Sequence, residues 1–203
     1  MTNKVSKAER TRQFIIETTA TIFNTKGYAG TSLADLTEAT GLTKGSIYGN
    51  FDSKEDVALA VFDHNLAKVK LAVQQRMEKA TSNAEKLLVY ADVYRSFIRT
   101  SFLPGGCPIL NTATEADDTN SLLKDRAAKA ILDWKKTNID LLKAGIKSGE
   151  FHDTTETERI ALSIIALIEG GVMIARVTNN PASLDKVLKT VELLIRQAQV
   201  VNE

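Results

Sequence analysis

The chain has 203 residues, of which 43% are hydrophobic and 25% charged, and its formal net charge is +1. This is the composition of an ordinary globular protein, which excludes a disordered chain and gives no sign of a strongly charged partner. No apolar run approaches the roughly 20 residues of a membrane helix, and the N-terminus is polar, so we predict a cytoplasmic protein without a membrane partner. Cys107 is the single cysteine, which excludes an internal disulfide or a thiolate metal cluster.

Apolar residues recur at helical spacing along the chain and only three prolines interrupt them, so we predict an all-α fold of about nine helices and no strand. Ser6 and Glu9 form a capping box that starts the first helix, and Gly27 is expected to stop it. Two short helices follow. We expect Thr31 or Ser32 to cap one and Thr43 the other.

Six further helices are predicted from their periodicity and from their capping residues. Ser53 with Asp56, Thr155 with Glu158, and the Asn180-Pro181 pair are typical helix starts. The predicted ranges are 53–79, 83–101, 109–117, 122–148, 155–176 and 181–200.

The segment from residue 31 to residue 51 carries the strongest functional signal. Its apolar residues form one small inward face, comprising Leu33, Leu36, Leu42, Ile47 and Phe51, while Gly41 permits a sharp turn between the two short helices. The second helix keeps polar residues outside this face, where donors can meet a DNA major groove. The alternative is an ordinary helical hairpin whose polar side faces water.

The sequence GLTKGSIYGNFDSKE, residues 41–55, resembles the recognition helix of the TetR family running into its connecting helix. A preceding pattern of Ala20, Phe23, Gly27, Tyr28, Thr31 and Ser32 adds to this resemblance. The resemblance implies an N-terminal three-helix helix-turn-helix DNA-binding domain, residues 1–52. It also implies a larger C-terminal helical domain for ligand binding and dimerisation, residues 53–203.

By this resemblance the start of the second short helix reads base edges, and Tyr48 and Asn50 lie at the groove edge and the DNA backbone. Thr31 and Lys54 would contact phosphates, although Lys54 is alternatively a solvated surface lysine. The predicted DNA-binding residues are Thr31, Ser32, Thr43, Lys44, Gly45, Ser46, Tyr48, Asn50 and Lys54.

The body of the chain offers candidates for an apolar effector pocket, each of which is alternatively a plain core residue. Tyr90 and Tyr94 share one helical face, and Glu169 either has a structural partner or binds a polar group of the ligand. Cys107 would be a redox sensor only beside a cation. The predicted ligand-binding residues are Phe62, Leu66, Tyr90, Tyr94, Phe97, Cys107, Leu110, Asn111, Trp134, Glu169 and Met173, with Glu115 as a further lining residue.

The last two predicted helices carry wide apolar faces. Gly170 and Gly171 each cost about 1 kcal/mol relative to alanine in mid-helix, which close approach of another helix would offset. By resemblance these helices pair with their copies in a four-helix interface. The predicted dimer residues are Ile164, Ile168, Gly171, Val187, Val191, Leu194 and Ile195.

His64 and His152 are the only histidines, and neither has a metal-binding partner at helical spacing, so we predict no enzyme, no catalytic residues, no metal and no cofactor. The predicted function is that of a bacterial transcriptional repressor, binding a near-palindromic operator as a homodimer and released by a small-molecule effector. Activation is an alternative. So is an all-helical protein-interaction module without DNA binding.

Overall fold

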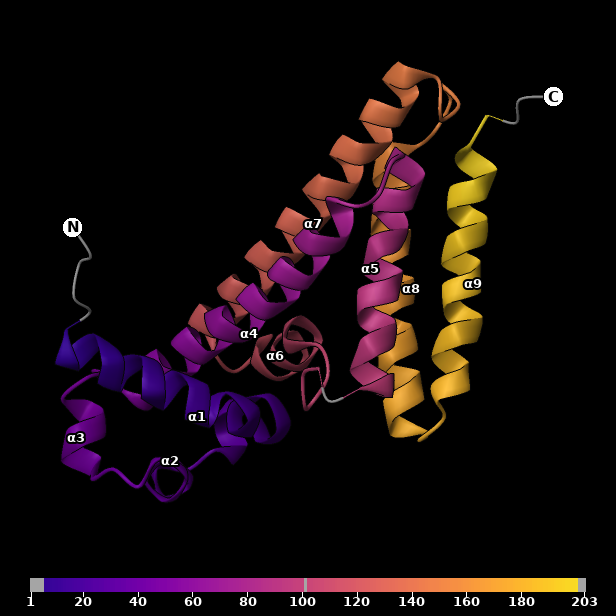
Figure 1. Cartoon of the computed structure of the whole chain (residues 1–203). Helices are drawn as coiled ribbons and strands as arrows, with labels where there is room; N and C mark the ends of the chain where they lie inside the picture. The colour runs from indigo at the N-terminus through magenta and orange to yellow at the C-terminus, as the bar shows by residue number, and fades with distance from the viewer. Residues whose placement is uncertain (1–5, 101, 201–203) are drawn as a thin grey trace. The chain divides into compact units, whose positions relative to one another are not determined.

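A computed structural model describes residues 6–100 and 102–200, and these residues form nine α-helices (Figure 1). The only strand-like pairing among them is a single antiparallel bridge between Phe151 and Gln199, and the all-α prediction is confirmed. In chain order the helices are α1 (Lys7–Gly30), α2 (Leu33–Thr40), α3 (Lys44–Tyr48), α4 (Lys54–Met77), α5 (Asn83–Arg99), α6 (Pro108–Ala116), α7 (Ser121–Ser148), α8 (Thr157–Val177) and α9 (Pro181–Ala198).

Local capping explains most of the helix starts. The Ser6 hydroxyl accepts from the Glu9 amide at 3.1 Å, and the Glu9 carboxylate accepts from the Ser6 amide at 2.8 Å, which is the predicted capping box. The Ser53 hydroxyl accepts from the Asp56 amide at the start of α4. Pro181 opens α9, as predicted. Helix α5 ends at Arg99, and residue 101 of its predicted range lies outside the described residues.

The predicted start of α8 is wrong. Thr155 does not cap the helix, because the N-cap position is Glu156 and the buried Thr155 hydroxyl has no hydrogen-bond partner among the described residues. The Glu158 carboxylate does not turn back to close a capping box. It binds the Lys135 ammonium group instead, at 2.8 Å.

The predicted stop at Gly27 is confirmed in part. Gly27 has φ +74° and a non-helical backbone, so the regular helix that starts at Lys7 ends there, but one more helical turn that the prediction did not include follows up to Gly30. That turn starts afresh at Tyr28, and its first amides need acceptors from outside the helix. Glu115 of α6 provides them, and a contact 87 residues away along the chain is invisible to local pattern analysis.

The chain divides into two compact units. The first unit comprises residues up to Lys68 together with Leu103–Ala127, and the second unit comprises Val69–Phe102 and the residues from Ala128 onwards. Helices α4 and α7 each run from one unit into the other. The predicted functional boundary between residues 52 and 53 falls inside the first unit.

The core of the first unit joins the helix-turn-helix segment to α1, α4 and α6. Ile15, Leu36 and Ile47 are fully buried, and Phe51 and Val57 close the cluster where α4 begins. Ala116 and Leu123 belong to the same cluster although they lie far along the chain. This core fixes α2 and α3 against a scaffold of longer helices.

The second unit is built on α5, α8 and α9, which pack against one another (Figure 1). Its buried residues include Leu87, Ile164, Ile168, Leu188 and Ile195.

Helix α8 corrects one expectation from the sequence, namely that no segment is long and apolar enough to cross a membrane. By length and composition alone it could cross a membrane, since its most apolar window has a mean hydropathy of 2.0. Of that window 44% is buried inside the protein, and a core helix passes the same test. The sequence prediction missed it by looking for an uninterrupted apolar run, which Glu169 and two glycines break.

Candidate DNA-binding surface

Helices α2 and α3 are joined by a tight turn at Gly41, which has φ +66°. An L-residue with a side chain rarely adopts this left-handed conformation, so glycine fits the position. The Gly41 amide donates to Thr37 O at 2.9 Å and closes α2. Thr43 then caps α3 by accepting from the Ser46 amide at 3.2 Å, as predicted.

Helix α3 turns its apolar side inward and its polar side outward. Ile47 is fully buried in the core of the first unit, whereas Lys44 and Gly45 are exposed. Ser46 and Tyr48 are half-buried, and the Lys44 ammonium lies 5.9 Å from the centre of the Tyr48 ring. This helix therefore presents a lysine, an exposed backbone at Gly45 and a hydroxyl to a binding partner.

Asn50, two residues after the end of α3, is held by an arginine that sequence analysis missed. The Arg12 guanidinium donates to Asn50 O at 2.6 Å and lies 3.9 Å above the centre of the Phe51 ring. The Asn50 amide nitrogen donates to Ser46 O at 2.9 Å. Asn50 is thus partly engaged in closing α3, while the exposed Arg12 adds positive charge beside it.

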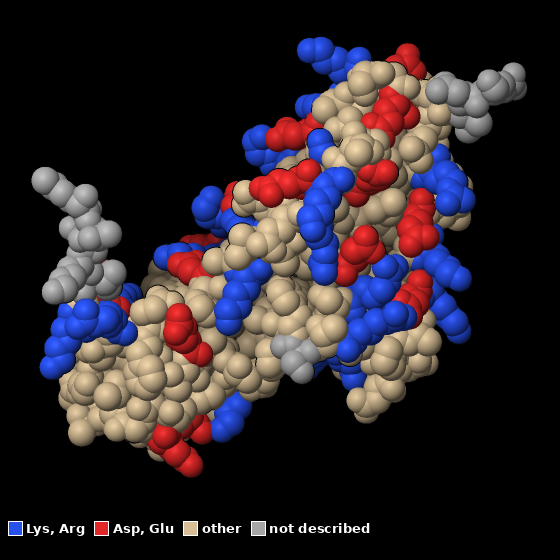
Figure 2. Space-filling model, in the orientation of Figure 1, with Lys and Arg blue, Asp and Glu red and all other residues tan. Residues whose placement is uncertain are grey.

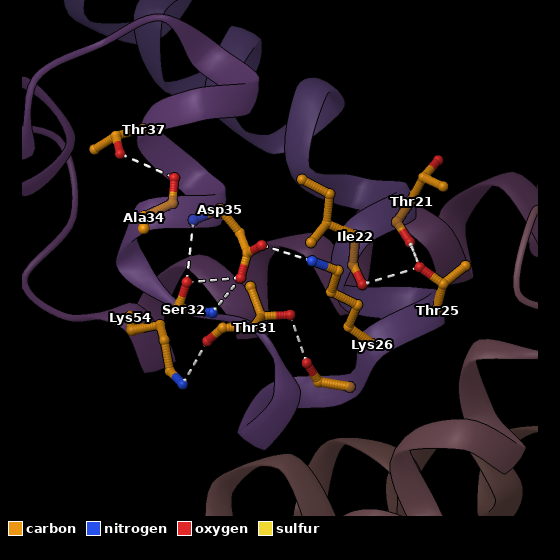
Figure 3. Close-up of polar contacts among 11 residues, drawn as sticks. Thr21, Ile22, Thr25, Lys26, Thr31, Ser32, Ala34, Asp35, Thr37 and Lys54 are labelled. Atoms are coloured by element: carbon orange, nitrogen blue, oxygen red, sulfur yellow. Dashed lines mark hydrogen bonds and ion pairs between the residues drawn. The ribbon is translucent and has the colours of Figure 1, made fainter.

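The start of α2 is fixed by a polar network (Figure 3). The Asp35 carboxylate accepts from the Ser32 amide and hydroxyl, both at 2.7 Å, and binds the Lys26 ammonium at 2.6 Å. Lys26 first, and then Ser32, holds the pKa of Asp35 far below its usual range. Since its proton points to Asp35, the Ser32 hydroxyl serves the capping box in this structure, although the residue is exposed.

Two residues predicted to contact phosphates are placed differently by the structure. Thr31 is 0% exposed, and its hydroxyl donates to Gly27 O at 2.6 Å (Figure 3). A side chain without exposed surface cannot touch DNA, so the prediction for Thr31 is corrected: it shapes the turn between α1 and α2. Lys54 is half-buried and donates to Tyr28 O and Thr31 O at 2.8 and 2.9 Å.

Lys54 therefore stabilises the end of α1, where carbonyl groups lack helical partners and a cation is favourable. Its ammonium group also lies 4.2 Å from the centre of the Tyr28 ring. Only one of its three N–H groups is left over from these two hydrogen bonds for a phosphate.

A polar cluster joins α1 to the loop before α6 and to α6 itself. The Asn24 amide donates to Pro104 O and Gly106 O, and Asn111 donates to Asn24 O at 3.0 Å. The Glu115 carboxylate accepts from the Tyr28 and Ala29 amides, both at 2.8 Å. Asn111 and Glu115 were predicted to line a pocket, and the structure corrects this, because both side chains are committed to α1.

The other ligand candidates of the first unit are Phe62 and Cys107, which are buried, and Leu66 and Leu110, which are half-buried. Cys107 is fully enclosed at the N-cap position of α6.

In the second unit, the predicted aromatic residues come together. Trp134 stacks on Tyr90 and on Tyr94, with ring centres 4.7 and 5.1 Å apart, and Tyr94 contacts Phe97 edge to face at 4.7 Å. Glu169 is 9% exposed. Met173 is 48% exposed and lies on the outer face of α8, which corrects its assignment to a pocket.

The predicted dimer residues require a larger correction. Ile164, Ile168, Val191 and Ile195 are buried inside a single chain, between α8, α9 and α5, and have no surface left for a partner. Gly171 is buried too, and a Cβ there would meet Leu184 of α9 at 2.9 Å. Val187 and Leu194 are half-buried. The glycine seam exists, but it joins α8 to α9 of the same chain.

The outer face of α8 is apolar instead. Leu162, Met173 and Val177 are 45%, 48% and 78% exposed, and Gly170 between them opens onto empty space. Their spacing places them on one side of the helix over about four turns. The sequence contained this face, but it did not distinguish it from the equally apolar face that enters the core.

Figure 2 shows acidic and basic side chains interspersed on the viewed face of the molecule. Within residues 6–100 and 102–200, no three histidine, cysteine or acidic side chains gather in a way that would hold a metal ion.

An exposed, capped second helix behind a tight turn, held on a three-helix core, defines the class of helix-turn-helix DNA-binding proteins. Residues 15–61 match the family described as bacterial regulatory proteins, tetR family, and residues 83–191 match the tetracyclin repressor-like C-terminal domain. The chain belongs to the TetR family of bacterial transcriptional regulators, whose members are regulators and not enzymes.

Individual relatives agree with this placement. A TetR-family regulator from Cytophaga hutchinsonii is 50% identical, with a TM-score of 0.94, over 98% of this chain and 100% of that one. The transcriptional repressor DhaR of Mycobacterium sp. (strain GP1) is 24% identical over 89% of each chain. A cysteine mutant of the regulator CifR, solved with 26 bp of double-strand operator DNA, shares the fold at 20% identity and a TM-score of 0.74, over 97% and 98% of the two chains.

Proposed function

We propose that this regulator is a cytoplasmic repressor that binds a near-palindromic operator as a homodimer and is released by a small-molecule effector. The observation that carries the DNA-binding half is the start of α3, where Lys44 and Gly45 are exposed and Ser46 is half-buried. The core and the Thr43 cap hold this start in one orientation. Support for repression and for operator binding comes from the relatives DhaR and CifR.

In this proposal α3 enters the major groove, and Lys44 donates to a base edge. Gly45 lets the backbone approach the DNA, while Ser46, Tyr48 and Asn50 lie along the groove. Arg12 joins the set as a phosphate contact, because it is exposed next to Asn50. Lys54 contributes to DNA binding chiefly by holding the turn at Thr31.

The dimer is proposed to form through the outer face of α8, comprising Leu162, Ala166, Gly170, Met173, Ile174 and Val177. An exposed apolar stripe of this length is costly to leave in water, and a second copy would cover it. We also propose the functional division that the sequence suggests: residues 1–52 read DNA, and residues 53–203 sense the effector and dimerise. Operator and effector then oppose each other by reciprocal linkage.

The test is DNA binding by the purified protein, measured by fluorescence anisotropy on duplexes from the DNA flanking its own gene and on scrambled duplexes. Lys44→Ala should weaken operator binding by roughly 5- to 150-fold, corresponding to 1–3 kcal/mol, and should affect scrambled DNA less. Lys143→Ala, at an exposed position of α7, is the matched control and should change neither. A protein that ignores all duplexes at low salt would instead support the helical interaction module.

A further inference from the structure

The centre of α7 contains an amide that is buried and unsatisfied. Asn138 is 0% exposed, and neither its amide nitrogen nor its amide oxygen has a hydrogen-bond partner among the described residues. One turn earlier Trp134 is 4% exposed, and its indole N–H lacks a partner as well. The two side chains share a helical face, because they are four residues apart.

Such a cluster is expensive for the protein alone. A buried polar group without a partner costs about 1–3 kcal/mol, and leucine at position 138 would avoid this cost at similar volume. Buried polar groups in folded proteins are nearly always paired with protein or water. The amide at Asn138 therefore points to a partner that is not part of the chain.

The same face of α7 bears the aromatic cluster of the second unit. The Trp134 ring is stacked with Tyr90 at 4.7 Å, with an angle of 24° between the ring planes, and with Tyr94 at 5.1 Å and 22°. Burial raises the pKa of Tyr90 to about 12, so its hydroxyl stays neutral at physiological pH. Nearly parallel aromatic planes suit a flat ring.

We infer that Trp134 and Asn138 recognise a planar, uncharged aromatic effector whose substituent both donates and accepts hydrogen bonds, as a carboxamide does. The ring joins the Tyr90–Trp134–Tyr94 stack, and the substituent satisfies the Asn138 amide and the indole N–H. A charged effector fits poorly, because Asn138, Trp134, Tyr90 and Tyr94 are all neutral and burying an unpaired charge is costly. The inference rests on the proposed effector response.

The protein carries its own reporter, since Trp134 is its only tryptophan. Titration of the full chain with naphthalene-2-carboxamide should change the tryptophan fluorescence saturably. Naphthalene-2-carboxylate, which is charged, and cyclohexanecarboxamide, which has no aromatic ring, should each bind about tenfold or more weakly. Equal responses to all three probes, or no saturable response to the carboxamide, would overturn the inference.

Asn138→Leu separates this site from a merely structural one. We expect this substitution to weaken the binding of naphthalene-2-carboxamide about tenfold or more. The melting temperature of the variant should stay equal or rise, because an unsatisfied group has been removed. A large fall in melting temperature, or unchanged probe affinity, would show that Asn138 has a structural role instead, such as binding a buried water. Operator binding without probe should match that of the wild type. If neither protein binds DNA, the proposed function itself fails, independently of this site.

Discussion

The two adjacent glycines of α8 give a matched pair of substitutions with opposite expectations. At Gly171 an added Cβ would lie 2.9 Å from Leu184 Cδ1 and 3.2 Å from Val187 Cγ1. Leu184 is itself buried in the core of the second unit, so it has little room to move. At Gly170 nothing lies within 4 Å of the added Cβ.

Gly171→Leu should therefore destabilise the single chain. Overpacking costs roughly 1–3 kcal/mol, and the better helix propensity of leucine returns a little under 1 kcal/mol, so the net loss is up to about 2 kcal/mol. For a chain of this size the upper value corresponds to a fall of roughly 4–8 °C in melting temperature. Gly170→Leu should leave the chain as stable or slightly more stable, because its side chain enters open space.

The dimer should respond in the opposite way. If the outer face of α8 is the interface, leucine at position 170 holds the two helices apart and weakens association. Sedimentation analysis over a range of concentrations measures this, and differential scanning fluorimetry measures the stability. The reasoning is refuted if Gly171→Leu weakens the dimer without lowering the melting temperature. An unchanged dimer in Gly170→Leu would remove the outer face of α8 from the interface.

Three further changes test the first unit. Glu115→Ala removes two charge-assisted hydrogen bonds to Tyr28 and Ala29, so we expect the free energy of unfolding to fall by about 2 kcal/mol and operator binding to weaken with it. The exposed Asp118→Ala control should change neither. Lys54→Met should lower the melting temperature as well as DNA affinity, unlike Lys44→Ala, and a purely electrostatic loss would contradict the capping role. Because Lys26 and Ser32 hold the pKa of Asp35 low, its stabilisation is present above the usual aspartate range and is lost as the pH falls through the folded pKa. Asp35→Asn should therefore make the melting temperature depend less on pH below about pH 4. The same pH dependence in the variant and the wild type would argue against this role of Asp35.

Local rules predicted the helices well because their signals are local. The capping box at Ser6, the turn at Gly41 and the cap at Thr43 depend on residues within a few positions of one another. The all-α fold and the inward face of the helix-turn-helix followed from the same short-range patterns. The extra turn after Gly27 did not, since it exists only because Glu115 lies beside it in space.

The roles of individual site residues were harder to predict for the same physical reason. Thr31 and Lys54 look like polar residues available to DNA, but each has an intramolecular partner that appears only in three dimensions. On α8 nearly the whole circumference is apolar, so periodicity could not say whether Ile168 or Met173 faces the core. Asn138 carried no sequence signal, because its significance lies in the partners that it lacks.

The hydrogen bonds from Asn111 and Glu115 to α1 have a consequence for building chimeric regulators. Exchanging only the first 52 residues between two relatives would separate Asn24 and Tyr28 from the α6 side chains that bind them. A foreign residue with a Cβ at position 27 would meet the Glu115 carboxylate at 2.5 Å. A graft that retains its own DNA preference and stability must therefore carry α6 along with the helix-turn-helix, as a transplant of two separate segments.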